Sequence, residues 1–123
     1  VTRHPGVNFV ICHLLAPNGK QEEELKRALE GLALPNVWFD LASVPHNCMD
    51  ASEPWKRAGA YVRLARDLVG ADKLLFGTDM PSALKEAPYG DYVRWIREME
   101  GLNDAEREQI LYQNAAKVYA GLS

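Results

Sequence analysis

Three apolar runs, at residues 7–13, 37–43 and 73–79, divide the chain into a repeating pattern. The first run, V-N-F-V-I-C-H, is nearly continuous and contains β-branched residues, which is typical of a strand buried on both faces of a parallel sheet. Each interval between the runs is long enough for a helix that crosses back over the sheet in the right-handed sense. The pattern therefore predicts three parallel strands joined by helices.

The segments between the runs have helical spacing. Residues Gln21–Leu32 carry apolar side chains on one face and charged ones on the other, and Asn18-Gly19 predicts a turn before them. In residues 53–69 an apolar stripe recurs at helical intervals. Ser52 is the expected N-cap of this second helix, and Gly70 is its expected C-terminal stop.

Two further helices are predicted after the third run. One passes through residues 92–99, and the next begins at Asn103, which forms a capping box with Glu106. This last helix continues, or a further one restarts, through Tyr119, and Gly121 ends it. The order β-α-β-α-β-α-α indicates an α/β fold, and no linker divides the chain, so residues 1–123 are expected to form a single domain.

Composition narrows the class of protein. Apolar residues make up 47% of the 123 residues and charged residues 25%, as in ordinary soluble domains. The formal net charge of −3 offers no positive surface for nucleic acid, and the apolar runs are too short for a bilayer, so we expect neither partner. Cys12 and Cys48 are the only cysteines, which fits a reducing compartment and a cytoplasmic location.

The carboxyl ends of parallel strands are where α/β folds bind their ligands, and they select the first candidates. His13 ends the first run and Asp79, in G-T-D-M-P, ends the third. A carboxylate there can bind a metal ion or take up a proton, and an imidazole can orient or protonate a substrate. The alternatives are a histidine that is satisfied in the core and an aspartate that caps the next turn.

Other polar residues near the strand ends have weaker claims. His46, Cys48 and Asp50 are all of metal-ligating types, but their spacing matches no compact zinc pattern. His46 is instead a candidate for substrate binding, the alternative being a solvated loop. Asp40 is expected to be a structural acid paired with a neighbouring strand, and Cys12 is expected to point away from His13.

Four segments together resemble the C-terminal part of the amidohydrolase-related family of metal-dependent hydrolases and decarboxylases. They are N-F-V-I-C-H-L at 8–14, N-V-W-F-D-L at 36–41, D-K-L-L-F-G-T-D-M-P at 72–81 and N-A-A-K-V-Y at 114–119. The resemblance implies a (β/α)8 barrel in which the three strands are the sixth, seventh and eighth.

The same resemblance implies roles for two residues. Asp79 matches the aspartate of the eighth strand, which commonly binds the metal, and His13 matches the histidine of the sixth strand. The family's other usual metal ligands, a His-x-His pair and a fifth-strand histidine, are not in this chain. The family often has glycine at the position of Leu15. The larger leucine side chain would narrow the rim of the pocket or indicate a different substrate.

Taken together, the sequence predicts a piece of a longer metal-dependent enzyme. The resemblance implies a divalent cofactor, zinc, and either hydrolysis or non-oxidative decarboxylation of small carboxylated or lactone-like substrates. We expect the isolated chain to be inactive, and to form homo-oligomers or associate with the missing half of the barrel, because its sheet edges are unpaired. The alternative is a non-catalytic, stand-alone α/β binding or interaction module.

Overall fold

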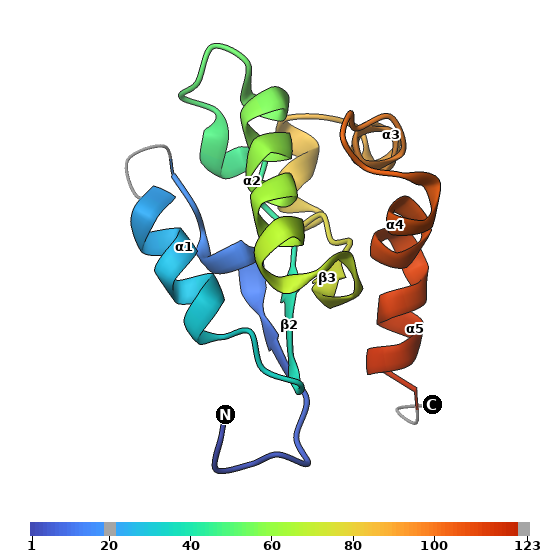
Figure 1. Ribbon diagram of the computed structural model, residues 1–123. Coiled ribbons are helices and arrows are strands. Elements are labelled where there is room, and N and C mark those ends of the chain that lie inside the picture. The colour runs from blue at the N-terminus through green and yellow to red at the C-terminus, as the bar shows by residue number, and fades with distance from the viewer. Residues whose placement is uncertain (19–21, 121–123) are drawn as a thin grey trace.

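Three parallel strands form one sheet in the order of the sequence, as predicted (Figure 1). The computed structural model describes residues 1–18 and 22–120. The strands are β1 (Phe9–Ile11), β2 (Val37–Asp40) and β3 (Leu74–Leu75). In the register of the sheet, Ile11 is paired with Phe39, and Asp40 is paired with Leu75.

The strands are shorter than the apolar runs. After Ile11 the chain turns into a 3₁₀ segment, η1 (Cys12–Leu15), so Cys12 and His13 do not belong to the strand. The exposed thiol of Cys12 corrects the prediction that it lies in a buried strand. Likewise β3 ends at Leu75, and Asp79 lies in the loop beyond it. Apolar character predicts burial and not backbone conformation, since Leu14 in η1 has no exposed surface although it lies in a turn.

The helices lie close to their predicted positions. They are α1 (Glu22–Gly31), α2 (Pro54–Val69), α3 (Tyr89–Arg97), α4 (Asp104–Glu108) and α5 (Asn114–Val118). A π-helical stretch, η5 (Gln109–Gln113), joins the last two, and 3₁₀ turns occur at η2 (His46–Cys48), η3 (Ala71–Lys73) and η4 (Ser82–Lys85).

The helix ends partly confirm the sequence reasoning. Asn103 and Glu106 form the predicted capping box, and Gly70 is the C-cap of α2 with a φ of 95°. Ser52 is not the N-cap of α2, however, because the helix begins one residue later, after Glu53. The predicted turn residue Gly19, the helix start at Gln21 and the stop at Gly121 lie outside the described residues.

The core lies mainly between the sheet and the helices that cover one of its faces, α1 and α2 (Figure 1). Its side chains with no exposed surface include Leu14, Leu29, Phe39, Leu41, Val62, Leu74, Ile96 and Ile110. Trp38 and Leu75 alternate with Phe39 and Leu74 along their strands, and they pack with Val118 in a second cluster. The sheet is therefore apolar on both faces, as the first run predicts.

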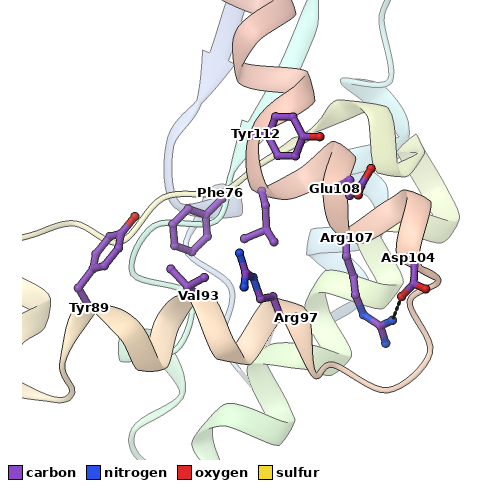
Figure 2. A pocket seen from close by; sticks show the side chains of 9 residues that line it. Phe76, Tyr89, Val93, Arg97, Asp104, Arg107, Glu108 and Tyr112 are labelled. Atoms are coloured by element: carbon purple, nitrogen blue, oxygen red, sulfur yellow. Dashed lines mark hydrogen bonds and ion pairs between the residues drawn. The ribbon is translucent and has the colours of Figure 1, made fainter.

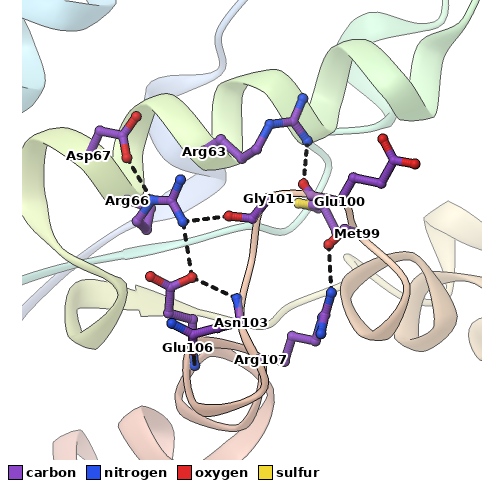
Figure 3. Close-up of polar contacts among 9 residues, drawn as sticks. All are labelled: Arg63, Arg66, Asp67, Met99, Glu100, Gly101, Asn103, Glu106 and Arg107. Atoms are coloured by element: carbon purple, nitrogen blue, oxygen red, sulfur yellow. Dashed lines mark hydrogen bonds and ion pairs between the residues drawn. The ribbon is translucent and has the colours of Figure 1, made fainter.

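The loop between α3 and α4 is held to α2 by arginine side chains (Figure 3). Arg66 donates one hydrogen bond to the carbonyl oxygen of Gly101 at 2.7 Å and another to Glu106 at 3.0 Å. Arg63 donates to the carbonyl oxygen of Glu100 at 3.1 Å. Because Glu106 also belongs to the capping box, the start of α4 and the surface of α2 are one polar network.

No helix within residues 1–18 and 22–120 combines the length and apolar character that a membrane crossing requires.

Candidate functional site

The backbone takes up an unusual conformation in the segment that follows each of the three strands. Six non-glycine residues have a positive φ, among those described: His13, Leu14, Leu15 and Ala16 after β1, Ser43 after β2, and Asp79 after β3. A left-handed conformation costs an L-residue about 1–2 kcal/mol. Such residues concentrate at functional sites, where the surrounding structure holds them in place. This observation points to the carboxyl edge of the sheet, which lies toward the upper end of the molecule in Figure 1.

The loops after β2 and β3 remain in contact beyond the end of the sheet. The amide of Leu41 donates a hydrogen bond to the carbonyl oxygen of Leu75 at 2.9 Å. Two residues after the end of β3, Gly77 lies against Ala42, and two residues beyond that, Asp79 meets Ser43. The segments after β2 and β3 therefore leave the sheet side by side and bring Ser43 and Asp79 together.

Asp79 presents its carboxylate at this edge. The hydroxyl of Ser43 donates a hydrogen bond to Asp79 Oδ2 over 2.6 Å, a length typical of O–H donors bound to a carboxylate. Ser43 is buried, with 8% of its surface exposed, whereas Asp79 is exposed. No hydrogen bond to Asp79 Oδ1 comes from the described part of the chain, so this oxygen is free to accept a proton or bind a cation.

His13 lies at the same edge, and its backbone is tied to β2. Its amide donates a hydrogen bond to Asp40 Oδ1 at 2.9 Å, and the same oxygen accepts from the amide of Ala42 at 3.1 Å. Asp40 is therefore a structural acid that joins the exits of β1 and β2, as expected. The imidazole of His13 is half-buried, and among the described residues no hydrogen bond joins it to Asp79.

Asp40 also acts on the neighbouring thiol. Its negative charge is the main cause that raises the pKa of Cys12 above 9.0, and desolvation and a side-chain hydrogen bond add to the effect. A raised pKa leaves little of the nucleophilic thiolate at neutral pH. The structure thus gives an electrostatic reason why Cys12 is a poor nucleophile. Strand alternation does not supply one, because Cys12 and His13 lie in η1.

His46 connects two of the loops at this edge. Its Nδ1 lies 2.7 Å from Glu86 Oε1, so the segment after β2 is joined to the segment after β3. The side chain of His46 is 60% exposed and that of Glu86 only 19%. Sequence reasoning did not single out Glu86 or the hydroxyl of Ser43, because neither lies in a motif and each contacts a residue far away along the chain.

The H-N-C-M-D segment does not form a metal site. Cys48 is buried, and burial raises the pKa of its thiol, whereas His46 and Asp50 face solvent. Throughout residues 1–18 and 22–120, no three His, Cys, Asp or Glu side chains are grouped so as to hold a metal ion. Asp79, with one free oxygen, fits a single ligand position and needs ligands from elsewhere.

A groove of about 600 Å³ lies between α3 and the α4–η5 segment, away from these residues (Figure 2). Phe76, Tyr89 and Tyr112 form part of its wall, and Arg107 pairs with Asp104 at 2.8 Å on its other side. His13, His46 and Asp79 do not line this groove. The groove is therefore separate from the residues at the carboxyl edge of the sheet, and that edge is the candidate site.

The chain matches known proteins over almost its whole length. The family model described as amidohydrolase matches residues 1–121. The L-fucono-1,5-lactonase of Burkholderia ambifaria is 31% identical over 102 residues, which cover 76% of this chain and 33% of that protein.

Solved structures show the same fold. An amidohydrolase from Burkholderia multivorans with bound zinc is 25% identical with a TM-score of 0.82, and the match covers 97% of this chain and 46% of that one. The 5-carboxyvanillate decarboxylase of Sphingomonas paucimobilis is 15% identical with a TM-score of 0.66, over 97% and 35% of the two chains. The chain thus spans less than half the length of each of these relatives.

Proposed function

This chain belongs to the amidohydrolase family, and on that premise we propose that it is the C-terminal portion of a metal-dependent (β/α)8-barrel hydrolase. In this proposal residues 1–123 are one partial domain, and β1, β2 and β3 are the sixth, seventh and eighth strands of the barrel. The three parallel strands in sequence order, and the coverage of only 46% of a related chain, support this assignment.

The substrate class that we propose is a small lactone, or a lactone-like carboxylated molecule. The observation that carries the proposal is the Asp79 carboxylate, held at the carboxyl edge with Oδ1 free, in a chain 31% identical to a lactonase. Lactone hydrolysis requires a group that takes a proton from the attacking water and one that returns a proton to the ring oxygen. The Asp79 carboxylate suits the first role when the water lies beside the cation that Oδ1 binds, and the half-buried imidazole of His13 at the same edge suits the second.

A divalent cation, which we propose to be zinc, supplies Lewis-acid polarisation of the substrate carbonyl when it is bound. Asp79 contributes one of its ligands in this proposal, and residues outside this chain contribute the others. The zinc in the related Burkholderia multivorans structure supports this choice of metal. Because one carboxylate does not hold a metal by itself, we propose that the 123-residue chain alone is inactive.

His46 is proposed to bind the substrate. Its Nδ1 is taken by Glu86, which leaves Nε2 for another partner in a side chain that is 60% exposed. A carboxylate partner at Nδ1 fixes the orientation of an imidazole and the tautomer that it adopts. His46 can therefore offer Nε2 to a polar group of a substrate that enters between the loops after β2 and β3.

The test uses the protein expressed from its complete gene and loaded with zinc. We expect hydrolysis of sugar lactones, detected by the acid that each turnover releases. We expect Asp79→Asn to lower kcat/KM at least 100-fold, because it removes a group that acts in the transition state. Release of CO2 from carboxylated aromatics instead of lactone opening would assign the decarboxylase alternative. Absence of turnover with both substrate classes would favour the non-catalytic module and overturn the proposal.

A further inference from the structure

We infer that Ser43 is a positioning residue, which holds the Asp79 carboxylate by Oδ2 so that Oδ1 is the oxygen presented to the reacting groups. This inference rests on the proposed function, because it gives Asp79 its role there. Nothing in the sequence pattern marks Ser43, and the inference comes from the contacts of its hydroxyl and its backbone.

The backbone of Ser43 shows that the position is demanding. Its φ of 59° lies in the left-handed region, which glycine adopts without the steric cost that serine bears. Its carbonyl oxygen accepts a hydrogen bond from the amide of Asn47 at 2.9 Å, and the adjacent amide of Val44 donates to Leu41. These hydrogen bonds of the turn hold Ser43 in this conformation. Glycine would suit the backbone better, but it would lack the hydroxyl that contacts Asp79.

Among the described residues, that hydroxyl has one hydrogen-bond partner. It lies 2.6 Å from Asp79 Oδ2, and the residue that carries it is buried. A serine hydroxyl has one proton to donate, and its carboxylate acceptor lies at the exposed rim. The hydrogen bond therefore restrains the rotation of the carboxylate about its terminal torsion, which is otherwise broad.

The Asp79 backbone contributes a second restraint. Its φ is 64°, and its carbonyl oxygen accepts a hydrogen bond from the amide of Ala83 at 3.1 Å, which begins the turn of η4. With both the backbone and Oδ2 held, Asp79 offers one oxygen in one direction. A ligand or general base that is oriented before the substrate binds has no orientation to lose during the reaction.

The experiment compares Ser43→Gly and Ser43→Ala in the protein expressed from its complete gene. Both variants lack the hydroxyl, but only glycine relaxes the backbone, so an effect shared by the two belongs to the hydrogen bond. Ser52→Ala is the matched control, because Ser52 is an exposed serine of the same connection between β2 and α2. Urea unfolding midpoints show whether each variant is folded.

The first readout is the 13C chemical shift of the Asp79 carboxyl carbon at constant pH, without metal. We expect the same displacement in Ser43→Gly and Ser43→Ala and none in Ser52→Ala. The second readout is zinc affinity by chelator competition. We expect a loss of roughly 10- to 100-fold in both Ser43 variants, the usual cost of removing a group that orients a metal ligand. An unchanged carboxyl shift in both variants, or an unchanged zinc affinity in both, would overturn the inference.

A further variant separates this inference from the proposed function. If Asp79→Asn binds zinc as tightly as the wild type, the role proposed for Asp79 is wrong, whatever the Ser43 variants do. If Asp79→Asn loses zinc but the two Ser43 variants do not, only the positioning role of Ser43 is overturned. Loss of zinc affinity in all three variants, with a displaced carboxyl shift in the Ser43 pair, supports both.

Discussion

Gly77 lies so close to Ala42 that a β-carbon added to the glycine would stand 3.1 Å from the Ala42 β-carbon. It would also stand 3.4 Å from the Ala42 amide nitrogen. This approach occurs between the last backbone hydrogen bond of β2 and β3 and the contact of Ser43 with Asp79. The absence of a side chain at Gly77 therefore allows the two loops to converge on the candidate site.

We expect Gly77→Ala to force Ala42 away by a few tenths of an ångström. Overpacking of this kind costs about 1–3 kcal/mol, measured here as the free energy of unfolding in urea. Gly90→Ala is the control, because Gly90 lies in α3 with nothing within 4 Å of the added carbon, and alanine favours a helix. Equal stability of the two variants would contradict the close contact.

A substitution of His46 tests its proposed contact with the substrate. We expect His46→Ala to raise KM about 5-fold with little change in kcat, because an exposed hydrogen bond to a substrate contributes about 1 kcal/mol. His4→Ala is the matched control, since His4 precedes β1 and so lies away from the carboxyl edge. Steady-state kinetics of the intact protein provide the measurement, and equal KM values for the two variants would count against the contact.

The thiol of Cys12 is predicted to react slowly although it is exposed. Asp40 raises its pKa above 9.0, so at a pH just below 9.0 the folded chain holds less thiolate than the unfolded chain. In the pH range above 9.0 the unfolded chain therefore binds fewer protons at this site, and the contribution of Cys12 to stability falls as pH rises.

Alkylation by iodoacetamide measures this effect. We expect the Cys12 rate in the folded chain to stay below the rate in urea, with the midpoint of its pH profile higher than in the unfolded chain. Cys48, with 1% of its surface exposed, should react only after unfolding. Cys12→Ser is the control that identifies the reacting thiol, and a folded rate equal to the unfolded one would contradict the prediction.

Asn114 joins the last helix to the start of β3. Its side-chain amide donates to the carbonyl oxygens of Ala71 and Leu74 at 2.7 and 2.8 Å, and only 5% of the residue is exposed. We expect Asn114→Ala to lower the free energy of unfolding by about 1–3 kcal/mol, because it removes a buried donor from both carbonyl groups, although Ala71 keeps its hydrogen bond from the amide of Leu74. Gln113→Ala, at an exposed neighbouring position, should change it by less than about 0.5 kcal/mol.

The 123-residue chain is predicted to associate when it is produced alone. β1 and β3 each pair on one side only in the described part of the chain, and Val7, Leu84 and Tyr112 expose half or more of their surface. Unpaired edges and apolar surface favour contacts between chains. Native mass spectrometry should show multiples of 13.8 kDa, and a single monomeric species that melts cooperatively would contradict the expectation.

Much of the fold follows from the sequence, because burial leaves a periodic trace. The three apolar runs and the helical spacing between them predicted a parallel sheet, and the pattern of Asn103 and Glu106 predicted a helix start that the structure confirms. These features depend on residues close together in the chain. The lengths of all three strands did not follow, including β2, which ends at Asp40 and not at Ser43, because apolar side chains in a turn can be buried as well as those in a strand.

For the candidate site, the sequence determined that His13 and Asp79 stand at the ends of the apolar runs, and the resemblance implied roles for them. It did not determine what holds them. Ser43 and Asp79 are 36 residues apart, and His46 and Glu86 are 40 apart. No periodicity connects such pairs, since each contact exists only after the sheet has aligned its strands and the loops have converged. Tertiary structure alone therefore decided that a serine would hold one oxygen of Asp79 and leave the other free.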